Sequence, residues 1–193
     1  ESLGNGGKLK ECKSAFQLAK MWNKAPDLSS WDVSGVTSTY AMFVQLDAVT
    51  GDLDVSGWDM SKVENFNGMF QSITTNPDVS GWTCCVAATY TGGMFQSAKK
   101  FDRDISNWVM SNVQSTYRMF YDADAFNSDV SDWTTHSVTM MKEMFYGADN
   151  FDQDVSNWDT SSVTDASSMF KQTKMSYPLS SWDMSSVDSS KCS

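Results

Sequence analysis

The stretch that decides the fold is residues 154–170, DVSNWDTSSVTDASSMF, because close variants of this string recur along the chain. One tryptophan marks each copy: Trp31, Trp58, Trp82, Trp108, Trp133, Trp158 and Trp182. A Met-Phe dipeptide follows in most copies and ends at Phe43, Phe70, Phe95, Phe120, Phe145 and Phe170. Successive tryptophans lie 24 to 27 residues apart. A period in this range predicts a solenoid of stacked coils.

Composition and charge narrow the fold class and the partners. The 193 residues suit one domain, and 40% hydrophobic residues with 13% aromatics suffice for a core. The formal charge of −10 repels phosphate backbones and anionic lipids, so we expect neither nucleic acid nor a membrane surface as partner. No apolar run reaches the roughly 18 residues of a membrane span, so no membrane insertion is expected. The opening residues, ESLGNGG, lack an initiator Met and a signal-peptide pattern, which is typical of a mature or excised segment.

The repeats predict two parts. Residues 1–26 are expected to form an N-terminal cap and half-repeat, because Leu9, Cys12, Phe16 and Ala19 have the spacing of one helix face. Residues 27–193 are expected to form the repeat solenoid. Its coils are 27–53, 54–77, 78–103, 104–128, 129–153, 154–177 and a partial coil, 178–193. Because the last coil stops where its Met-Phe should begin, we expect the protein either to continue or to be capped differently there.

Each coil is predicted to be a short strand followed by a helix. Around each tryptophan, Trp and the residue two positions later are expected to point inward, as on a strand. A Ser suited to a helix N-cap follows, and inward positions then recur at helical spacing, as in Val113, Thr116, Met119, Phe120 and Ala123. We therefore expect an α/β solenoid of about seven strand–helix coils, with a parallel sheet on one face and the tryptophans stacked as a structural ladder.

These residues carry a family resemblance. The pattern F-[DN]-x-D-[VI]-S-x-W-[DT]-x-S-x-V-T-x-M-x-x-M-F is seen best in residues 151–170, and its apolar positions match the start of a leucine-rich repeat. From about residue 9 to 193 the chain resembles the BspA-type leucine-rich-repeat proteins. The resemblance implies a right-handed stack and a secreted or surface-displayed adhesion module without common catalytic residues. Coil 78–103 departs from the pattern at Thr83, Cys84 and Cys85, and coil 104–128 departs at Val109.

Rows of aspartate and serine raise the possibility of metal binding or catalysis. The first aspartate row lies four residues before Trp: Asp27, Asp54, Asp78, Asp104, Asp129 and Asp154. The second aspartate row follows Trp directly: Asp32, Asp59, Asp159 and Asp183. Stacked carboxylates could bind Ca²⁺, but we favour bonds from loop N–H groups for the first row and simple solvation for the second.

The serine row lies two residues before Trp: Ser29, Ser56, Ser80, Ser106, Ser131, Ser156 and Ser180. It is predicted to form hydrogen bonds between coils. With His136 as the single histidine, a catalytic triad is not expected. We therefore predict no enzyme, cofactor or metal.

The four cysteines, Cys12, Cys84, Cys85 and Cys192, lack the C-x-x-C spacing of a zinc site. Cys12 and Cys84 are predicted to be buried free thiols. Cys85 is expected to face outward. Either Cys85 or Cys192 could pair with a residue outside this segment, whereas Cys12 and Cys192 are expected at opposite ends of the stack, too far apart to bridge.

The candidate binding face consists of the residues one before, one after and three after each tryptophan. These residues are small and polar, and the charge is lowest in the middle of the stack. Solenoids bind partners on such faces, although a merely solvated sheet is the alternative. The candidate ligand-binding residues are Thr83, Cys85, Val109, Ser111, Thr134, His136 and Asp159.

Two functions follow as hypotheses. The first is a non-enzymatic extracellular or cell-surface scaffold for adhesion, which binds a protein or glycan on this face. The second is a structural spacer in a larger assembly, which docks through its ends and Cys192.

Overall fold

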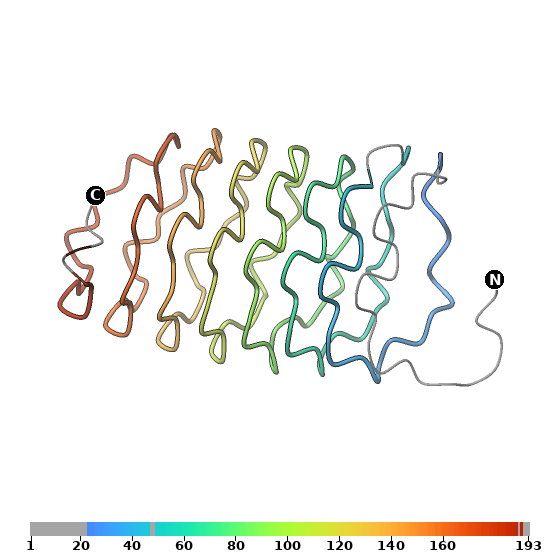
Figure 1. The fold of residues 1–193 in the computed structure, drawn as a ribbon, viewed down its shortest axis with the longest axis horizontal. Helices are drawn as coiled ribbons and strands as arrows, with labels where there is room; N and C mark the ends of the chain where they lie inside the picture. Colours follow the sequence, from blue (N-terminus) through green and yellow to red (C-terminus); the bar gives the residue numbers. More distant parts are fainter. Residues whose placement is uncertain (1–22, 47–48, 189, 191–193) are drawn as a thin grey trace.

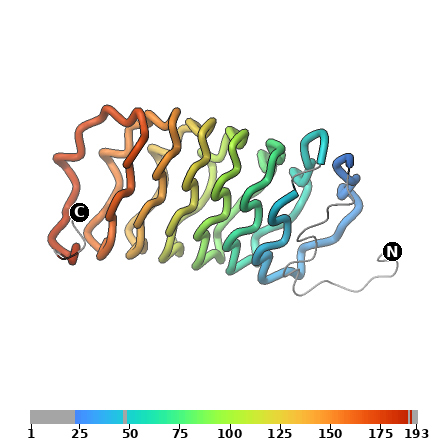
Figure 2. Tube along the Cα trace, turned by 45° about the horizontal axis from the view of Figure 1, so that its top comes forward, coloured from blue at the N-terminus to red at the C-terminus, as the bar shows by residue number. Residues whose placement is uncertain are grey.

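The computed structural model describes residues 23–46, 49–188 and 190. Flattened coils stack along one axis, in the order of the sequence, from residue 23 to residue 188 (Figures 1 and 2). The predicted repeat solenoid is therefore confirmed for the tryptophan-bearing repeats. The predicted cap falls mostly on residues 1–22, including Leu9, Cys12, Phe16 and Ala19, and these lie outside the described residues.

The predicted strand–helix alternation is wrong. The described residues contain no α-helix and no strand longer than one residue; each coil is a chain of tight turns. The backbones of neighbouring coils pair through isolated parallel bridges. The longest series of bridges is Ser38↔Asn65, Asn65↔Tyr90, Tyr90↔Ser115, Ser115↔Met140 and Met140↔Asp165. This series lies in the segment for which we expected a helix, not around the tryptophans.

Backbone dihedrals explain why no helix forms before and after each Met-Phe. Every fourth residue of this segment has positive φ, and an α-helix needs negative φ throughout. The pairs are Ala41 and Gln45, Gly68 and Ser72, Gly93 and Ser97, Arg118 and Asp122, Glu143 and Gly147, and Ser168 and Gln172. Because these residues are left-handed, alternate N–H groups point out of the coil. They donate to carbonyl groups of the next coil instead of continuing a helix.

The second coil shows this alternation. The Gly68 N–H donates to the Gly92 carbonyl of the next coil at 3.0 Å, and the Phe70 N–H donates to the Met94 carbonyl at 2.9 Å. Between them, the Met69 N–H turns back to the Phe66 carbonyl at 3.0 Å. Each coil therefore satisfies its backbone partly by tight turns and partly through the adjacent coil, as buried N–H and C=O groups require.

The core lies between two walls of backbone. The phenylalanine wall is formed by the segments that carry the Met-Phe dipeptides, and the tryptophan wall opposite it is formed by the segments around the tryptophans. The Trp58 N–H closes a turn onto the Val55 carbonyl at 3.0 Å, which bends the segment where a strand was expected. The indole N–H then donates to the preceding coil, from Trp58 Nε1 to the Leu28 carbonyl at 3.2 Å. Trp82, Trp133, Trp158 and Trp182 repeat this bond with the preceding coil. The ladder is thus fastened by hydrogen bonds as well as by packing.

Aromatic columns fill the space between the two walls. Phe43, Phe70, Phe95, Phe120, Phe145 and Phe170 stack in one file, with ring centroids 5.5 to 5.8 Å apart. Indole pairs stack at 6.0 to 6.4 Å: Trp31 on Trp58, Trp82 on Trp108, Trp133 on Trp158 and Trp158 on Trp182. A second phenylalanine file, Phe101, Phe126 and Phe151, stacks at 6.0 Å. The predicted column of like residues is confirmed.

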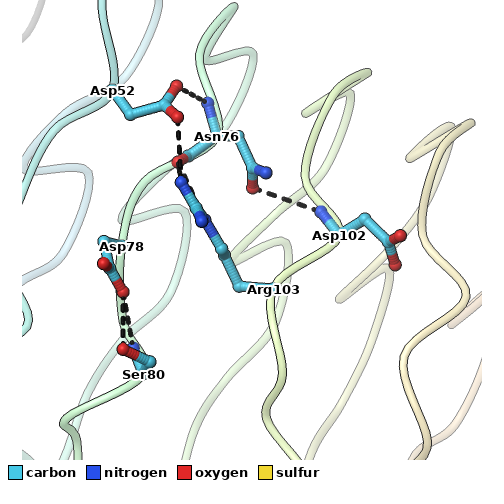
Figure 3. Close-up of polar contacts among 6 residues, drawn as sticks. All are labelled: Asp52, Asn76, Asp78, Ser80, Asp102 and Arg103. Carbon is cyan, nitrogen blue, oxygen red and sulfur yellow. Dashed lines mark hydrogen bonds and ion pairs between the residues drawn. The ribbon is translucent and has the colours of Figure 1, made fainter.

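A polar ladder runs along one edge of the stack, six residues before each tryptophan from Trp58 to Trp182. The Asp52 Oδ1 accepts the Asn76 N–H at 2.9 Å, and the Asn76 Oδ1 accepts the Asp102 N–H at 3.3 Å (Figure 3). The ladder continues through Asn127, Asp152 and Ser176. Aspartate alternates with asparagine up to Asp152, so neighbouring carboxylates are two coils apart. That spacing of roughly 10 Å reduces their mutual repulsion.

One cation reinforces this edge across two coils. Arg103 Nη2 donates to Asp52 Oδ2 at 2.9 Å and to the Asn76 carbonyl at 3.2 Å (Figure 3). The guanidinium thus spans the edge of the intervening coil.

Candidate binding faces

The post-tryptophan row consists of the residues that directly follow each ladder tryptophan: Asp32, Asp59, Thr83, Val109, Thr134, Asp159 and Asp183. Every member is exposed. The Val109 N–H donates to the Cys84 carbonyl at 3.1 Å, which joins the two central coils at this row. Its uncharged centre, Thr83, Val109 and Thr134, is flanked by carboxylates on both sides. This exposed and uncharged centre is therefore a candidate surface for binding a partner.

Most of the predicted ligand-binding residues are accessible. Thr83, Val109, Thr134, His136 and Asp159 are exposed, and Ser111 is half-buried. Cys85 is fully buried, so its assignment to the binding face is wrong.

Cys85 is buried because it is bonded to its neighbour in the chain. Cys84 and Cys85 form a disulfide between adjacent residues, and both side chains have no exposed surface. Cys85 has a φ of 77°, which turns its side chain into the core beside Cys84. Cys84 is therefore not a free thiol, and Cys85 does not face outward. The predictions for Cys12 and Cys192 lie outside the described residues.

Val86, next to the disulfide, is a second exposed apolar residue of the coil 78–103. Val86 is 47% exposed, and Val109 is 41% exposed. The Asn112 amide donates to the Val86 carbonyl at 2.7 Å, which links the valine's backbone to the next coil.

Both aspartate rows make local turns. In the first row the Asp78 Oδ1 accepts the Ser80 hydroxyl at 2.7 Å and the Ser80 N–H at 3.1 Å (Figure 3). In the second row the Asp159 Oδ1 accepts the same two groups from Ser161. The second row is therefore structured by hydrogen bonds, not only solvated. Among the described residues no cluster of carboxylate, histidine and cysteine side chains suits a metal ion.

These hydrogen bonds perturb the carboxylates. The Ser80 hydroxyl, followed by the Ser80 N–H, lowers the pKa of Asp78. The Ser161 hydroxyl and N–H lower the pKa of Asp159, and the charge of His136 adds a smaller effect in the same direction. Lowered pKa values keep these carboxylates ionised, which suits acceptors of hydrogen bonds and not acids that donate protons.

The serine row bonds within its own coil. The hydroxyls of Ser29, Ser56, Ser80 and Ser106 donate to the first-row aspartate two residues earlier, at 2.6 to 2.7 Å. The predicted hydrogen bonds between coils are wrong for these four, because the nearest strong acceptor is the carboxylate of the same turn.

A second exposed feature was not predicted, and it lies on the phenylalanine wall. The tyrosine groove has a volume of about 240 Å³ and is lined by Tyr40, Ala41, Asn67, Gly68, Gln71, Gly92, Gly93, Gln96, Ser115 and Tyr117. Trp and Phe side chains enter the core from the two walls, so this groove and the post-tryptophan row lie on opposite faces. The signal in the sequence was the Gly92-Gly93 pair between repeats that carry tyrosine.

The C-terminal end of the stack carries an apolar cleft. Its volume is about 240 Å³, and its lining is Ala166, Met169, Phe170, Leu179, Trp182 and Met184. Met184 is 42% exposed. Among the described residues, no helix is long and apolar enough to cross a membrane.

The stacked coils, their aromatic columns and their exposed rows define the class of this molecule as a repeat solenoid. The chain belongs to the family described as "Mycoplasma protein of unknown function, DUF285", whose model matches residues 10–133 and 91–192. Neither the curated proteins nor the solved structures give a match.

Proposed function

We propose that this chain is a non-enzymatic binding module that acts outside the reducing cytosol, at the cell surface or in the extracellular space. Its post-tryptophan row receives a protein or glycan partner. The observation that carries the proposal is the exposed, uncharged centre of that row at Thr83, Val109 and Thr134, flanked by carboxylates. The exposed Val86 and Val109 side chains favour a protein that presents an apolar side chain with basic groups around it.

Two further observations support the location. The Cys84–Cys85 disulfide is typical of proteins outside the reducing cytosol. The repeat pattern of residues 151–170 resembles that of the BspA-type surface proteins, and we propose this relationship as the finer family assignment. A direct check of the disulfide is alkylation of the denatured protein, with and without reduction, followed by mass spectrometry.

The binding proposal is tested by adding charge to the centre of the row. The variant Thr83→Glu, Val109→Glu, Thr134→Glu is fluorescently labelled and applied to a panel of purified extracellular proteins and to a printed glycan panel. We expect the wild type to bind at least one component and the triple variant to bind it at least tenfold more weakly.

The matched control adds the same charge elsewhere, through Gln45→Glu, Gln114→Glu, Gln172→Glu at exposed positions. It should bind as the wild type does. The proposal fails if the wild type binds nothing on either panel, or if the control loses as much affinity as the triple variant.

The apolar cleft at the C-terminal end favours a second candidate, a structural spacer that docks through its end. In that case Met184→Glu should abolish association with the rest of the assembly, whereas the row variant should associate normally. Affinity purification of each variant from the native source, with quantitative mass spectrometry, distinguishes the two.

A further inference from the structure

We propose that the tyrosine groove is a binding site for a short, neutral oligosaccharide. Tyr40 and Tyr117 stand at its two ends and are 48% and 37% exposed, and the glycines between them form the floor. The tyrosines are three coils apart, or roughly 14 Å at the spacing of paired backbones. That is the length of a di- or trisaccharide, with one sugar ring available to each tyrosine.

The floor is flat because Gly92 carries no side chain. A Cβ on Gly92 would lie 3.1 Å from the Tyr117 carbonyl oxygen and 3.2 Å from the Asn67 Oδ1, closer than ordinary contact. Any other residue at this position would therefore fill the groove between the two tyrosines.

The groove is lined by an asparagine whose side-chain oxygen lacks a partner. The Asn67 Oδ1 is buried and accepts no hydrogen bond. An unpaired buried oxygen costs about 1–3 kcal/mol, so a donor that reaches it is favoured. This oxygen lies 3.2 Å from the position that a Cβ on Gly92 would take, so it borders the space above the glycine floor, where a sugar hydroxyl can donate to it. Gln71 and Gln96 also line the groove and add further amide donors and acceptors.

Charge and backbone chemistry select the class of ligand. No charged side chain of the described residues lines the groove, which disfavours phosphate, carboxylate and ammonium ligands. A peptide that adds a strand needs free backbone groups, but the Gly68 N–H already bonds to the Gly92 carbonyl and the Gly93 N–H to the Tyr117 carbonyl. Recognition therefore falls to tyrosine rings and amides. Sugars offer apolar C–H faces and hydroxyls to match both.

The Tyr117 ring is held in place from one side. The Arg118 guanidinium lies 5.0 Å from its centroid and 4.9 Å from that of Tyr121, and Arg118 is itself paired with Glu143. Such fixing lowers the conformational entropy lost on binding.

The test uses the whole chain and neutral oligosaccharides of two to four units: glucans, mannans, galactans and N-acetylglucosamine oligomers. Binding is first screened on a printed panel and then measured by isothermal titration calorimetry. We expect one series to bind. Tyr40→Ala and Tyr117→Ala should each raise its Kd at least tenfold, which is a loss of about 1.4 kcal/mol of binding free energy. Asn67→Ala should also weaken binding, and Gly92→Ala should abolish it.

Tyr90→Ala is the matched control, because Tyr90 is 45% exposed on the same wall but does not line the groove. It should bind as the wild type does, and circular dichroism should show that all variants are folded. The proposal is overturned if no neutral oligosaccharide binds at millimolar concentration, if only charged glycans bind, or if Tyr90→Ala weakens Kd as much as Tyr117→Ala. This surface is separate from the post-tryptophan row, so the outcome is independent of the triple variant there.

Discussion

The phenylalanine file predicts that the same substitution should cost more in the middle of the stack than at its end. Phe120 is fully buried and stacks on Phe95 at 5.7 Å, on Phe145 at 5.5 Å and on Phe126 at 3.9 Å. Loss of a buried Phe side chain costs about 3–5 kcal/mol, and each aromatic pair adds about 0.5–1.5 kcal/mol. Because these terms overlap, we expect Phe120→Ala to lower the free energy of unfolding by about 5 kcal/mol.

Phe170 is the comparison site at the end of the file. It is half-buried, and it stacks on Phe145 at 5.8 Å and Phe151 at 6.2 Å on one side only, with a tilted contact to Trp182 on the other. Part of its surface is already hydrated in the folded protein. Phe170→Ala should therefore cost roughly half as much, about 2–3 kcal/mol.

Urea denaturation followed by tryptophan fluorescence measures both losses on one scale. Phe120→Leu, expected to cost about 1–2 kcal/mol, gives a central variant that stays folded if Phe120→Ala does not. Equal losses at the two sites, or a larger loss for Phe170→Ala, would refute the idea that stacking from both sides stabilises the column.

Three further predictions concern the backbone, the carboxylates and the polar edge. Gly81→Ala should destabilise the protein by about 2 kcal/mol, because its Cβ would lie 2.2 Å from a carbonyl oxygen of the preceding coil, whereas Gly57→Ala at the same repeat position should change stability by less than about 0.5 kcal/mol; thermal melts of both test this. The Ser106 N–H and hydroxyl lower the pKa of Asp104, so this carboxylate stabilises the fold above its unfolded pKa of about 4, and the contribution is lost as pH falls through the lower folded pKa; NMR titration of Ser106→Ala should show the Asp104 pKa rising only part of the way to its ordinary range, because the hydroxyl is lost and the backbone N–H remains. Asn127→Asp would place three carboxylates in succession on the polar ladder and should lower stability by about 0.5 kcal/mol in low salt, an effect that urea melts should find removed by 1 M NaCl.

The repeat spacing predicted the column but not the path of the backbone. Val113, Thr116, Met119 and Phe120 are all buried, as an amphipathic helix would require. Tight turns with left-handed residues place the same side chains inward, so the apolar pattern does not distinguish the two. The distinguishing feature is positive φ, and residues such as Arg118 and Glu143 give no sign of it in the sequence. Their conformation follows from bonds to the next coil, not from local preference.

The candidate site could be predicted where repeat position alone decides exposure. Thr83, Val109 and Thr134 are exposed because the residue after each tryptophan points away from the core. Cys85 could not be placed by the same rule, since its positive φ and its bond to Cys84 break the local alternation. The tyrosine groove depends on which side chains from different coils meet, and that register appears only when the coils are stacked.

The hydrogen bonds between coils have a consequence for how the molecule can grow. The Gly68 and Phe70 N–H groups are satisfied by residues about one repeat further on, and the same relation holds at the next step of the stack. A whole extra repeat inserted at such a boundary would find the donors, acceptors and ring faces that its predecessor found. Duplication of a gene segment that encodes one period would thus lengthen the stack and leave the contacts between the existing coils intact. Loss of a few residues within a period would instead shift the following coils out of register.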